Sequence, residues 1–274
     1  MPIFSQLRIF PLNTNTGLRK MQSVTAEEKF QFDLEGYLVV KGVLSDAEVA
    51  ELNALADEAW PGEHDSSGLR RTSEVSQWGP RFRDLIDHPG IIPYLVEFMG
   101  PKFRVDHDYS MFMRRGELRS GLHGGPSPYS YEGDHWYRYT DGVIRNGLSV
   151  FTYNLSACRA GDGGFACVPG SHKSPLIGSI PGEVRRFERP AHYVVQPPVE
   201  AGDVIIFTEA LVHGTMPWNA AHERRALLYK YSPGHSSWAS EYYDPANYPG
   251  ATEQQFRIMA APSVGSRPDS VQEA

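Results

Sequence analysis

The chain of 274 residues is 41% hydrophobic and 22% charged, a composition typical of a globular protein with one sizeable core. Its 26 Lys and Arg residues against 33 Asp and Glu residues give a formal net charge of -7, and no basic run is long enough to follow a phosphate backbone, which argues against a nucleic acid polymer as partner. Because no apolar stretch reaches the roughly 20 residues of a membrane span and the N-terminus lacks a secretory signal pattern, we expect a cytoplasmic protein with no membrane partner.

The first part of the chain predicts an extension followed by a helical region. Residues 1–23 show no sustained period and are predicted to be an N-terminal extension, while residues 24–274 are predicted to form a single domain. The segment 32–40 ends in a β-branched and aromatic run that predicts a strand. Ser45 and Glu48 then form a capping box, which predicts a helix that ends near Pro61, and a second helix is expected over residues 91–99.

Short strand-forming segments separated by Gly and Pro dominate the chain after residue 102. They cover residues 103–113, 148–155, 164–168, 192–196, 204–208 and 225–231. Many short strands after a helical region predict an α+β, mainly β protein, most simply a double-stranded β-helix of the jelly-roll, cupin-like type with flanking N-terminal helices. A short helix over residues 253–259 is predicted ahead of a disordered end.

Two histidines follow predicted strands and are next to glycine. His123 lies in the sequence GLHGGP (121–126), and His213 follows the apolar strand 204–208 and precedes Gly214. Glycines at such positions let a backbone or a bound ion approach the side chain closely. In a jelly roll, two histidines about 90 residues apart can meet at one mouth of the barrel and coordinate one metal ion.

An arginine pair begins the next predicted strand, 11 residues after His213. Arg224 or Arg225 can then lie on the same side of the barrel as the histidines, where a guanidinium can hold a carboxylate through two parallel hydrogen bonds. This arrangement suits a dicarboxylate cosubstrate that also chelates iron.

With these features, the chain resembles the phytanoyl-CoA dioxygenase family of Fe(II)/2-oxoglutarate-dependent oxygenases over residues 30–234. The segments that carry the resemblance are FDLEGYLVVKGVLS (32–45), GDGGF (161–165), VPGSHK (168–173), GDVI (202–205) and HGT (213–215). The ordered series is far more specific than any one of its members.

The resemblance implies a cofactor set and roles for individual residues. It implies that His123 and His213 bind Fe(II), that O2 is a cosubstrate, and that Arg224 pairs with the distal carboxylate of 2-oxoglutarate, with Arg225 as the second candidate. It also implies that His172, in the Pro-Gly-Ser-His segment, is not an iron ligand.

The chain departs from the family pattern two residues after the first histidine. There the usual 2-His-1-carboxylate triad has Asp or Glu, and this sequence has Gly125. Related 2-oxoglutarate-dependent halogenases bind chloride at the position that is left free, and glycine offers neither a ligand nor a Cβ to exclude the ion. Gly125 therefore joins the two histidines in the expected catalytic set, and we predict a halogenase that acts on an unactivated C–H bond of a small molecule, with chloride as a further ligand.

Two other functions stay open on the sequence alone. One is a hydroxylase of the same family, with water at the iron or with a displaced carboxylate from Asp106, Asp108 or Asp134. The other is a non-catalytic jelly-roll binding protein, which the iron content of the purified protein would distinguish.

Aromatic and basic residues near the expected iron site suggest a substrate pocket. Aromatic faces together with an arginine suit a planar or anionic small molecule. The candidate substrate-contacting residues are His107, Tyr109, Asp134, His135, Trp136 and Arg138.

Overall fold

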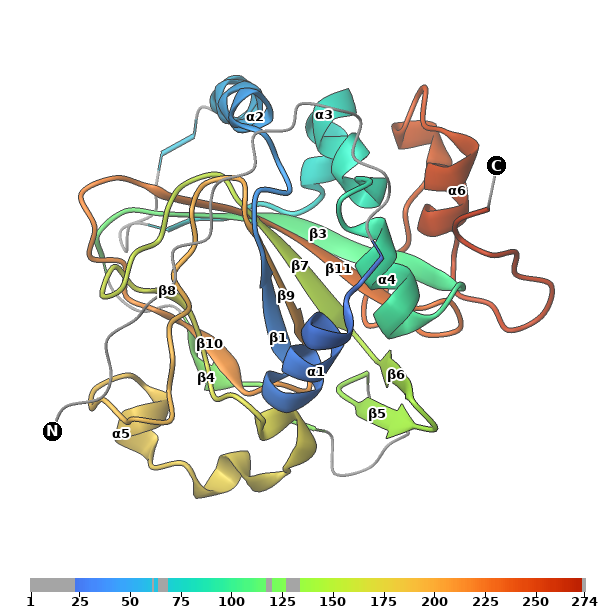
Figure 1. Ribbon diagram of the computed structural model, residues 1–274. Coiled ribbons are helices and arrows are strands. Elements are labelled where there is room, and N and C mark those ends of the chain that lie inside the picture. Colours follow the sequence, from blue (N-terminus) through green and yellow to red (C-terminus); the bar gives the residue numbers. More distant parts are fainter. Residues whose placement is uncertain (1–22, 61, 64–68, 117–119, 127–133, 273–274) are drawn as a thin grey trace, which may run out of the picture.

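Two facing antiparallel sheets form the centre of the protein (Figure 1). The computed structural model describes residues 23–60, 62–63, 69–116, 120–126 and 134–272, so the predicted extension over residues 1–23 lies outside the described residues except for its last one. In spatial order, the larger sheet contains β1 (Tyr37–Val40), β9 (Val204–Thr208), β7 (Ser149–Asn154), β11 (Arg224–Pro233), β3 (Phe103–Met113) and β2 (Leu69–Arg70). The smaller sheet contains β4 (Ser120–His123), β10 (His213–Met216) and β8 (Gly164–Cys167), and β5 (Tyr137–Thr140) and β6 (Val143–Asn146) form a separate hairpin.

Several helices cover the outer face of the larger sheet, and a short one packs beside the smaller sheet (Figure 1). The α-helices are α1 (Ala26–Glu35), α2 (Asp46–Ala59), α3 (Pro80–Arg83), α4 (Ile92–Met99), α5 (Gly182–Arg185) and α6 (Glu253–Met259). Short 3-10 helices occur at η1 (Val75–Trp78), η2 (Asp84–Asp87), η3 (Ser171–Lys173), η4 (Leu176–Ser179) and η5 (Pro245–Asn247). No helix among the described residues is long and apolar enough to cross a membrane.

Strand alternation divides the larger sheet into two chemically different faces. On β11, Leu227 and Tyr229 belong to the core cluster that packs under the helices, whereas Ala226 and Leu228 belong to a second cluster between the two sheets. Because successive side chains of a strand point to opposite faces, Arg224 and Lys230 lie on the inner face with Ala226 and Leu228. The inner face therefore carries cationic side chains at both ends of an apolar stretch.

This architecture confirms the predicted mainly β jelly-roll fold with N-terminal helices. The strands expected at residues 103–113 and 204–208 are present with those bounds. Residues 192–196 do not form a strand, because only Val195 makes an isolated bridge, to Cys167. β4, β10 and the β5–β6 hairpin escaped prediction because four-residue strands carry too little periodicity to stand out.

The N-terminal helices form where side chains satisfy the free backbone N–H groups. Ser45 and Glu48 make the expected capping box at the start of α2. Thr25 and Glu28 make a second capping box that starts α1, a helix that the strand interpretation of residues 32–40 did not anticipate. Gly36, in the left-handed region at φ 81°, ends α1 and leads directly into β1.

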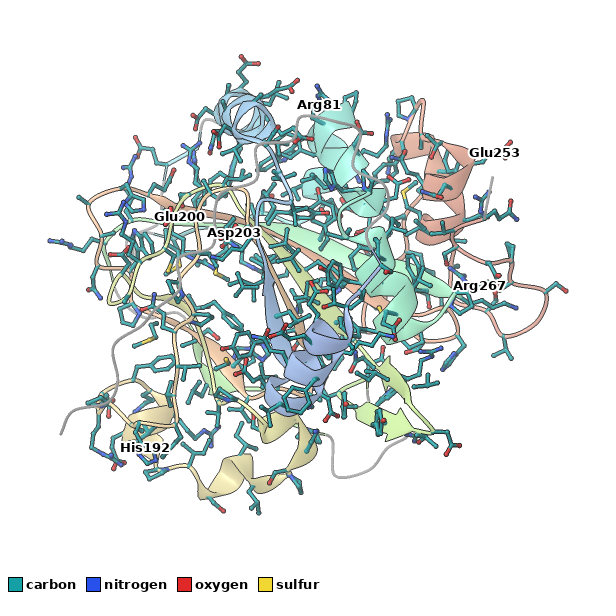
Figure 2. The ribbon with its side chains drawn as sticks, in the orientation of Figure 1. Arg81, His192, Glu200, Asp203, Glu253 and Arg267 are labelled. Atoms are coloured by element: carbon teal, nitrogen blue, oxygen red, sulfur yellow. The ribbon has the colours of Figure 1, made fainter. Side chains whose placement is uncertain are left out.

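The C-terminal segment is ordered along the larger sheet, so the expected disordered end is wrong for residues 260–272. α6 has the predicted bounds. Beyond it lies Arg267, which is labelled in Figure 2. Its guanidinium donates to the Ala261 carbonyl oxygen at 2.8 Å, and the Ser270 backbone N–H donates to the Pro101 carbonyl oxygen at 2.8 Å. Polar composition suggested disorder, but these hydrogen bonds fix the segment beside the start of β3.

The packing of α1 gives a prediction for stability. Phe32 is fully buried and stacks on Phe98 of α4, with ring centroids 4.1 Å apart. Phe32→Ala should lower the free energy of unfolding by about 3–5 kcal/mol, as loss of a buried phenyl ring usually does. Phe30→Ala removes a 66% exposed ring from the same helix and should change the free energy by less than about 0.5 kcal/mol. Equal effects of the two variants in urea unfolding would contradict this docking of α1.

Candidate metal and cosubstrate site

His123 and His213 lie side by side at the ends of two paired strands. They are register partners in the β4–β10 pair, and their ring centroids are 4.3 Å apart. Nδ1 of His123 is 2.8 Å from the Gly121 carbonyl oxygen, and Nδ1 of His213 is 2.7 Å from that of Leu211. Because a carbonyl oxygen only accepts, Nδ1 is the donor in these two contacts, and Nε2 is the ring nitrogen that is left to bind a metal ion. Metal-binding histidines are held in this way.

The surroundings of His213 keep its imidazole neutral. Its side chain is buried, and Phe207 packs against it with ring centroids 4.8 Å apart. Burial lowers the pKa of His213 to about 4, although the nearby Glu209 opposes this shift. His123 is exposed, so the pair extends from the interior to the surface.

A carboxylate that sequence reasoning missed lies beside this pair. Glu209 Oε2 is 3.7 Å from His213 Nε2, and Oε1 accepts a hydrogen bond from Lys230 Nζ at 2.7 Å. Burial alone would raise the pKa of Glu209, but His213 and Lys230 lower it to about 2, so the carboxylate is ionised. One sign was available in the sequence, because Glu209 is the only charged residue in the largely apolar run VIIFTEALV (204–212).

The imidazole pair and Glu209 do not yet form a closed ligand set. In the described part of the chain, no three His, Cys, Asp or Glu side chains are arranged to hold a metal ion. A bound ion would therefore require at least one side chain to move from its present position, or would take further ligands from elsewhere.

The expected alternative carboxylates are held by other groups. Asp106 accepts from Arg104 and from the Trp238 backbone N–H at 2.9 and 2.8 Å. Asp108 accepts from Ser76, and Asp134 accepts from Ser232 at 2.9 Å. Within the described residues, none of the three forms an ion pair with His123 or His213, so the structure does not support them as the displaced carboxylate.

Arg224 is a buried cation that faces the space between the sheets. Its side chain is 5% exposed, and its guanidinium makes only a weak 3.7 Å contact from Nη1 to Met113 Sδ, with no carboxylate of the described residues within ion-pair distance. Burial lowers its pKa, although the group stays charged because arginine titrates far above neutral pH. A buried guanidinium of this kind suits an anionic ligand.

Arg225, the second candidate, lies on the opposite face of β11. Its guanidinium pairs with Glu223 at 2.5 Å and with Asp57 at 2.6 Å, and it packs over the Phe112 ring. It therefore points under the helices, and the two neighbouring arginines have different surroundings because strand alternation sends them to opposite faces.

The two glycines after His123 differ in what surrounds them. A Cβ at Gly124 would lie 2.6 Å from the Leu211 carbonyl oxygen and 3.0 Å from His213 Nδ1, so glycine permits the close approach of this strand end to the turn before His213. A Cβ at Gly125 would lie 3.4 Å from Val212 Cγ2 and 3.6 Å from Ile177 Cγ2. A side chain at Gly125 would start toward an apolar cluster, and the φ of +91° would strain it.

Three of the six candidate substrate residues gather around Glu209 and Lys230. His135 Nε2 is 3.9 Å from Glu209 Oε2. Lys230 Nζ lies over the Tyr109 ring at 5.6 Å, and His107 stacks on Tyr109 with ring centroids 6.1 Å apart.

The other three candidates do not face this cluster. The Asp134 carboxylate is held by Ser232, as described above. Trp136 and Arg138 line a separate groove of about 260 Å³ on the β5–β6 hairpin. Their proximity to His123 in sequence does not bring them to the imidazoles, because the hairpin carries them away.

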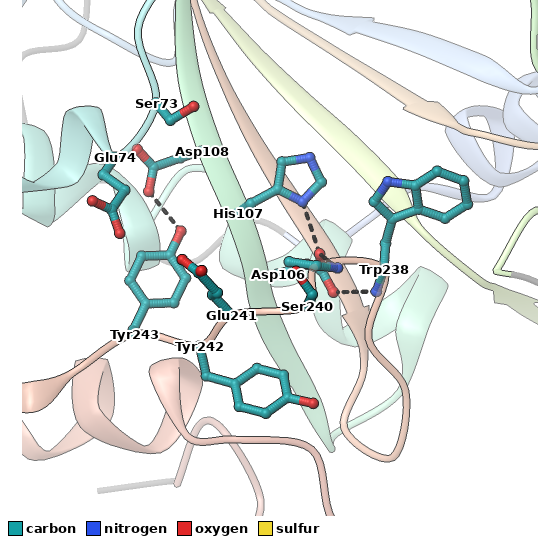
Figure 3. A pocket seen from close by; sticks show the side chains of 11 residues that line it. Ser73, Glu74, Asp106, His107, Asp108, Trp238, Ser240, Glu241, Tyr242 and Tyr243 are labelled. Carbon is teal, nitrogen blue, oxygen red and sulfur yellow. Dashed lines mark hydrogen bonds and ion pairs between the residues drawn. The ribbon is translucent and has the colours of Figure 1, made fainter.

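A cleft of about 560 Å³ opens next to the cluster, between β3 and residues 238–243 (Figure 3). His107 and Trp238 stand on one side of it, and Tyr242 and Tyr243 on the other. Trp238 also stacks on His135 with ring centroids 4.9 Å apart, so the cleft borders the residues around Glu209. Sequence reasoning missed Trp238, which comes from the tail beyond β11.

His172 lies apart from the imidazole pair. It is buried against Tyr137 with ring centroids 4.6 Å apart, and its Nε2 is 3.1 Å from the Asp33 carbonyl oxygen. Its surroundings are those of a structural histidine between α1 and the hairpin.

The burial of His172 gives a prediction for the pH dependence of stability. Burial, together with Lys173, lowers its pKa from 6.5 to about 4, so the unfolded chain binds this proton more tightly than the folded one. The folded state should therefore lose stability as the pH falls from 6.5 toward 4, by of order 3 kcal/mol from this group. His172→Gln should flatten the dependence by this amount in urea unfolding at pH 7 and pH 4.5. An unchanged slope would show that His172 is not the group responsible.

The model of one protein family, Phytanoyl-CoA dioxygenase (PhyH), matches residues 32–226. No curated protein matches the chain. Solved structures similar to this one include HygX from Streptomyces hygroscopicus with nickel and 2-oxoglutarate bound, at 23% identity and a TM-score of 0.69, covering 78% of this chain and 89% of that one. The α-ketoglutarate-dependent epimerase SnoN from nogalamycin biosynthesis is 18% identical with a TM-score of 0.59, covering 89% and 95%. At these identities the structural similarity establishes the fold.

Proposed function

Since the chain belongs to the phytanoyl-CoA dioxygenase family, we propose that it is an Fe(II)- and 2-oxoglutarate-dependent oxygenase that acts on an unactivated C–H bond of a small molecule. One observation carries the proposal. Two imidazoles that use Nδ1 and not Nε2 for hydrogen bonds to the described residues, His123 and His213, belong to the same sandwich as Arg224, a buried guanidinium without a carboxylate partner among the described residues. A metal ion would bind the two imidazoles, and a dicarboxylate would bind the guanidinium.

In this proposal the chain positions its cofactors and excludes water. His123 and His213 hold the iron, and Arg224 binds the distal carboxylate of 2-oxoglutarate through charge-assisted hydrogen bonds. The apolar side chains between the sheets, such as Phe165 and Phe207, keep this space dry, which strengthens the ionic contact. When bound, iron, 2-oxoglutarate and O2 supply the oxidation of the C–H bond.

Similar structures support a small-molecule substrate. HygX has been solved with nickel, 2-oxoglutarate and hygromycin B, and SnoN with Fe3+, α-ketoglutarate and nogalamycin RO. In this chain, the substrate would enter by the cleft beside Trp238 and reach the site past His135, Tyr109 and His107. These residues offer aromatic faces and ring nitrogens as hydrogen-bonding groups.

Halogenation is the second candidate chemistry. The observation that favours it is the missing carboxylate at Gly125, which leaves room for a chloride ligand. Against it stands the ionised Glu209 carboxylate, 3.7 Å from His213 Nε2, because a carboxylate in this place competes with an anion for the iron. Addition of chloride distinguishes the two chemistries. It should shift the visible absorption of the Fe(II)–2-oxoglutarate protein if chloride binds the iron, and it should leave the absorption unchanged if a carboxylate occupies that position.

The oxygenase proposal is tested by turnover of the cosubstrate. Protein loaded with Fe(II) should convert 2-oxoglutarate to succinate slowly in air without substrate, and faster with a substrate, whereas Ni(II)-loaded protein should release none. Succinate at the Ni(II) level under all these conditions would refute the oxygenase and leave a jelly-roll binding protein as the function.

A further inference from the structure

We propose that Glu209 is the carboxylate ligand of this metal site, supplied from the turn before His213 instead of from the position two residues after His123. The inference deepens the proposed function and rests on it, because it requires the imidazole pair to bind a metal ion. It assigns the third protein ligand to a residue outside the usual His-x-Asp/Glu pattern.

The distances within the site are compatible with a shared ion. Two ligand atoms bound at about 2.0–2.2 Å to one ion lie roughly 2.9–4.3 Å apart, depending on the angle between their bonds. Glu209 Oε2 and His213 Nε2 are 3.7 Å apart, within this interval. Within the described residues, no other carboxylate forms an ion pair with His213. Because no three such side chains of the described residues yet enclose an ion, closure of the site requires a change in a side-chain torsion angle.

One oxygen of Glu209 is left for a cation. Oε1 accepts from Lys230 at 2.7 Å, whereas the contacts of Oε2 to the Nε2 atoms of His213 and His135, at 3.7 and 3.9 Å, are too long for hydrogen bonds. The Glu209 side chain is 5% exposed, and no side chain of the described residues donates a hydrogen bond to Oε2. A metal ion at Oε2 would supply a partner there.

The backbone around Glu209 is fixed by hydrogen bonds. The Glu209 N–H donates to the Leu148 carbonyl oxygen at 2.9 Å, and the Val212 N–H donates to Ser171 Oγ at 2.8 Å. Gly124 lies against the same turn, since a Cβ there would be 2.9 Å from the Glu209 carbonyl oxygen. The segments that carry His123, Glu209 and His213 therefore pack directly on one another. Lys230 is then a positioning residue that holds Oε1 while Oε2 stays available.

The surroundings of Gly125 explain why the carboxylate comes from elsewhere. A side chain at this position would start beside Val212 and Ile177 in a strained backbone conformation. In a Glu209→Gln background, Gly125→Asp should therefore fail to restore metal binding. Restoration by this aspartate would contradict this account of Gly125, because it would show that the ordinary family position can serve the metal here.

Binding of Co(II) alone, measured by calorimetry and by visible absorption, tests the assignment without turnover. Glu209→Gln should weaken Co(II) binding by at least about tenfold and change the spectrum, since a carboxylate ligand is lost. Glu74→Gln, the same change at an exposed acid in the neighbouring cleft, should leave affinity and spectrum as in the wild type. The double variant Glu209→Gln/Lys230→Met, which leaves no unpaired buried charge, should bind Co(II) as weakly as Glu209→Gln.

Chloride gives a second readout. Removal of the ligand by Glu209→Gly should make the Co(II) spectrum sensitive to chloride or formate, whereas the wild-type spectrum should ignore both. Wild-type Co(II) affinity and an unchanged spectrum in Glu209→Gln would overturn the inference and leave the proposed function standing. A wild-type protein that binds no Co(II) would overturn both.

Discussion

Arg224→Met should weaken 2-oxoglutarate binding to the Ni(II)-loaded protein by at least about a hundredfold, with little change in Ni(II) affinity. The guanidinium is a buried cation of the inner face, and loss of one partner of a buried charge pair costs about 3–5 kcal/mol, while each 1.4 kcal/mol is about tenfold in affinity. Methionine keeps the length of the side chain and fits beside Met113. Calorimetric titration of 2-oxoglutarate measures the change directly.

The neighbouring arginine provides a matched control. Arg225→Met makes the same substitution one residue later, on the face where Glu223 and Asp57 surround the guanidinium. It should leave 2-oxoglutarate affinity within about twofold of the wild type, although its lost ion pairs will affect stability. If Arg225→Met were the variant that loses 2-oxoglutarate, the assignment of the two faces of β11 would be wrong.

His213→Ala should abolish specific metal binding, with an affinity loss of at least about a hundredfold, because a site with two imidazole ligands loses one of them. The substitution leaves the Glu209–Lys230 ion pair in place, so the metal-free protein should remain folded. Equilibrium dialysis with Fe(II) or Co(II), followed by metal analysis, gives the stoichiometry.

His222→Ala is the control for this experiment. His222 is exposed and contacts the Ala157 carbonyl oxygen, outside the imidazole pair. The His222→Ala variant should keep one metal ion per chain. Retention of stoichiometric metal by His213→Ala would show that the ion binds elsewhere, and the proposed site would have to be abandoned.

The sequence indicated the histidine pair and the two arginines as candidates because strand-end positions and the family resemblance mark them. His213 follows a continuous apolar strand, and Arg224 opens another, so strand geometry alone brings both to the sandwich. The choice between Arg224 and Arg225 required the face of β11, which depends on where the strand begins. A shift of the strand by one residue would exchange the faces on which Arg224 and Arg225 lie.

Glu209 could not be assigned from the sequence because its environment is assembled from distant segments. Lys230 comes from β11, and His135 comes from the segment before β5, and neither contact has a local signature. His107 and Tyr109 lie near Glu209 and Lys230, as strand alternation suggests, whereas a short hairpin turns Trp136 and Arg138 onto another surface. The positions of these residues depend on how distant segments pack together, which short sequence motifs do not encode.

Anaerobic addition of Fe(II) and then 2-oxoglutarate to the metal-free protein, followed by visible absorption, tests the central claim most directly. We expect a metal-to-ligand charge-transfer band that requires both additions, is lost in His213→Ala, needs far more 2-oxoglutarate in Arg224→Met, and does not shift with chloride. Absence of the band in the wild-type protein at saturating Fe(II) and 2-oxoglutarate would contradict the oxygenase assignment.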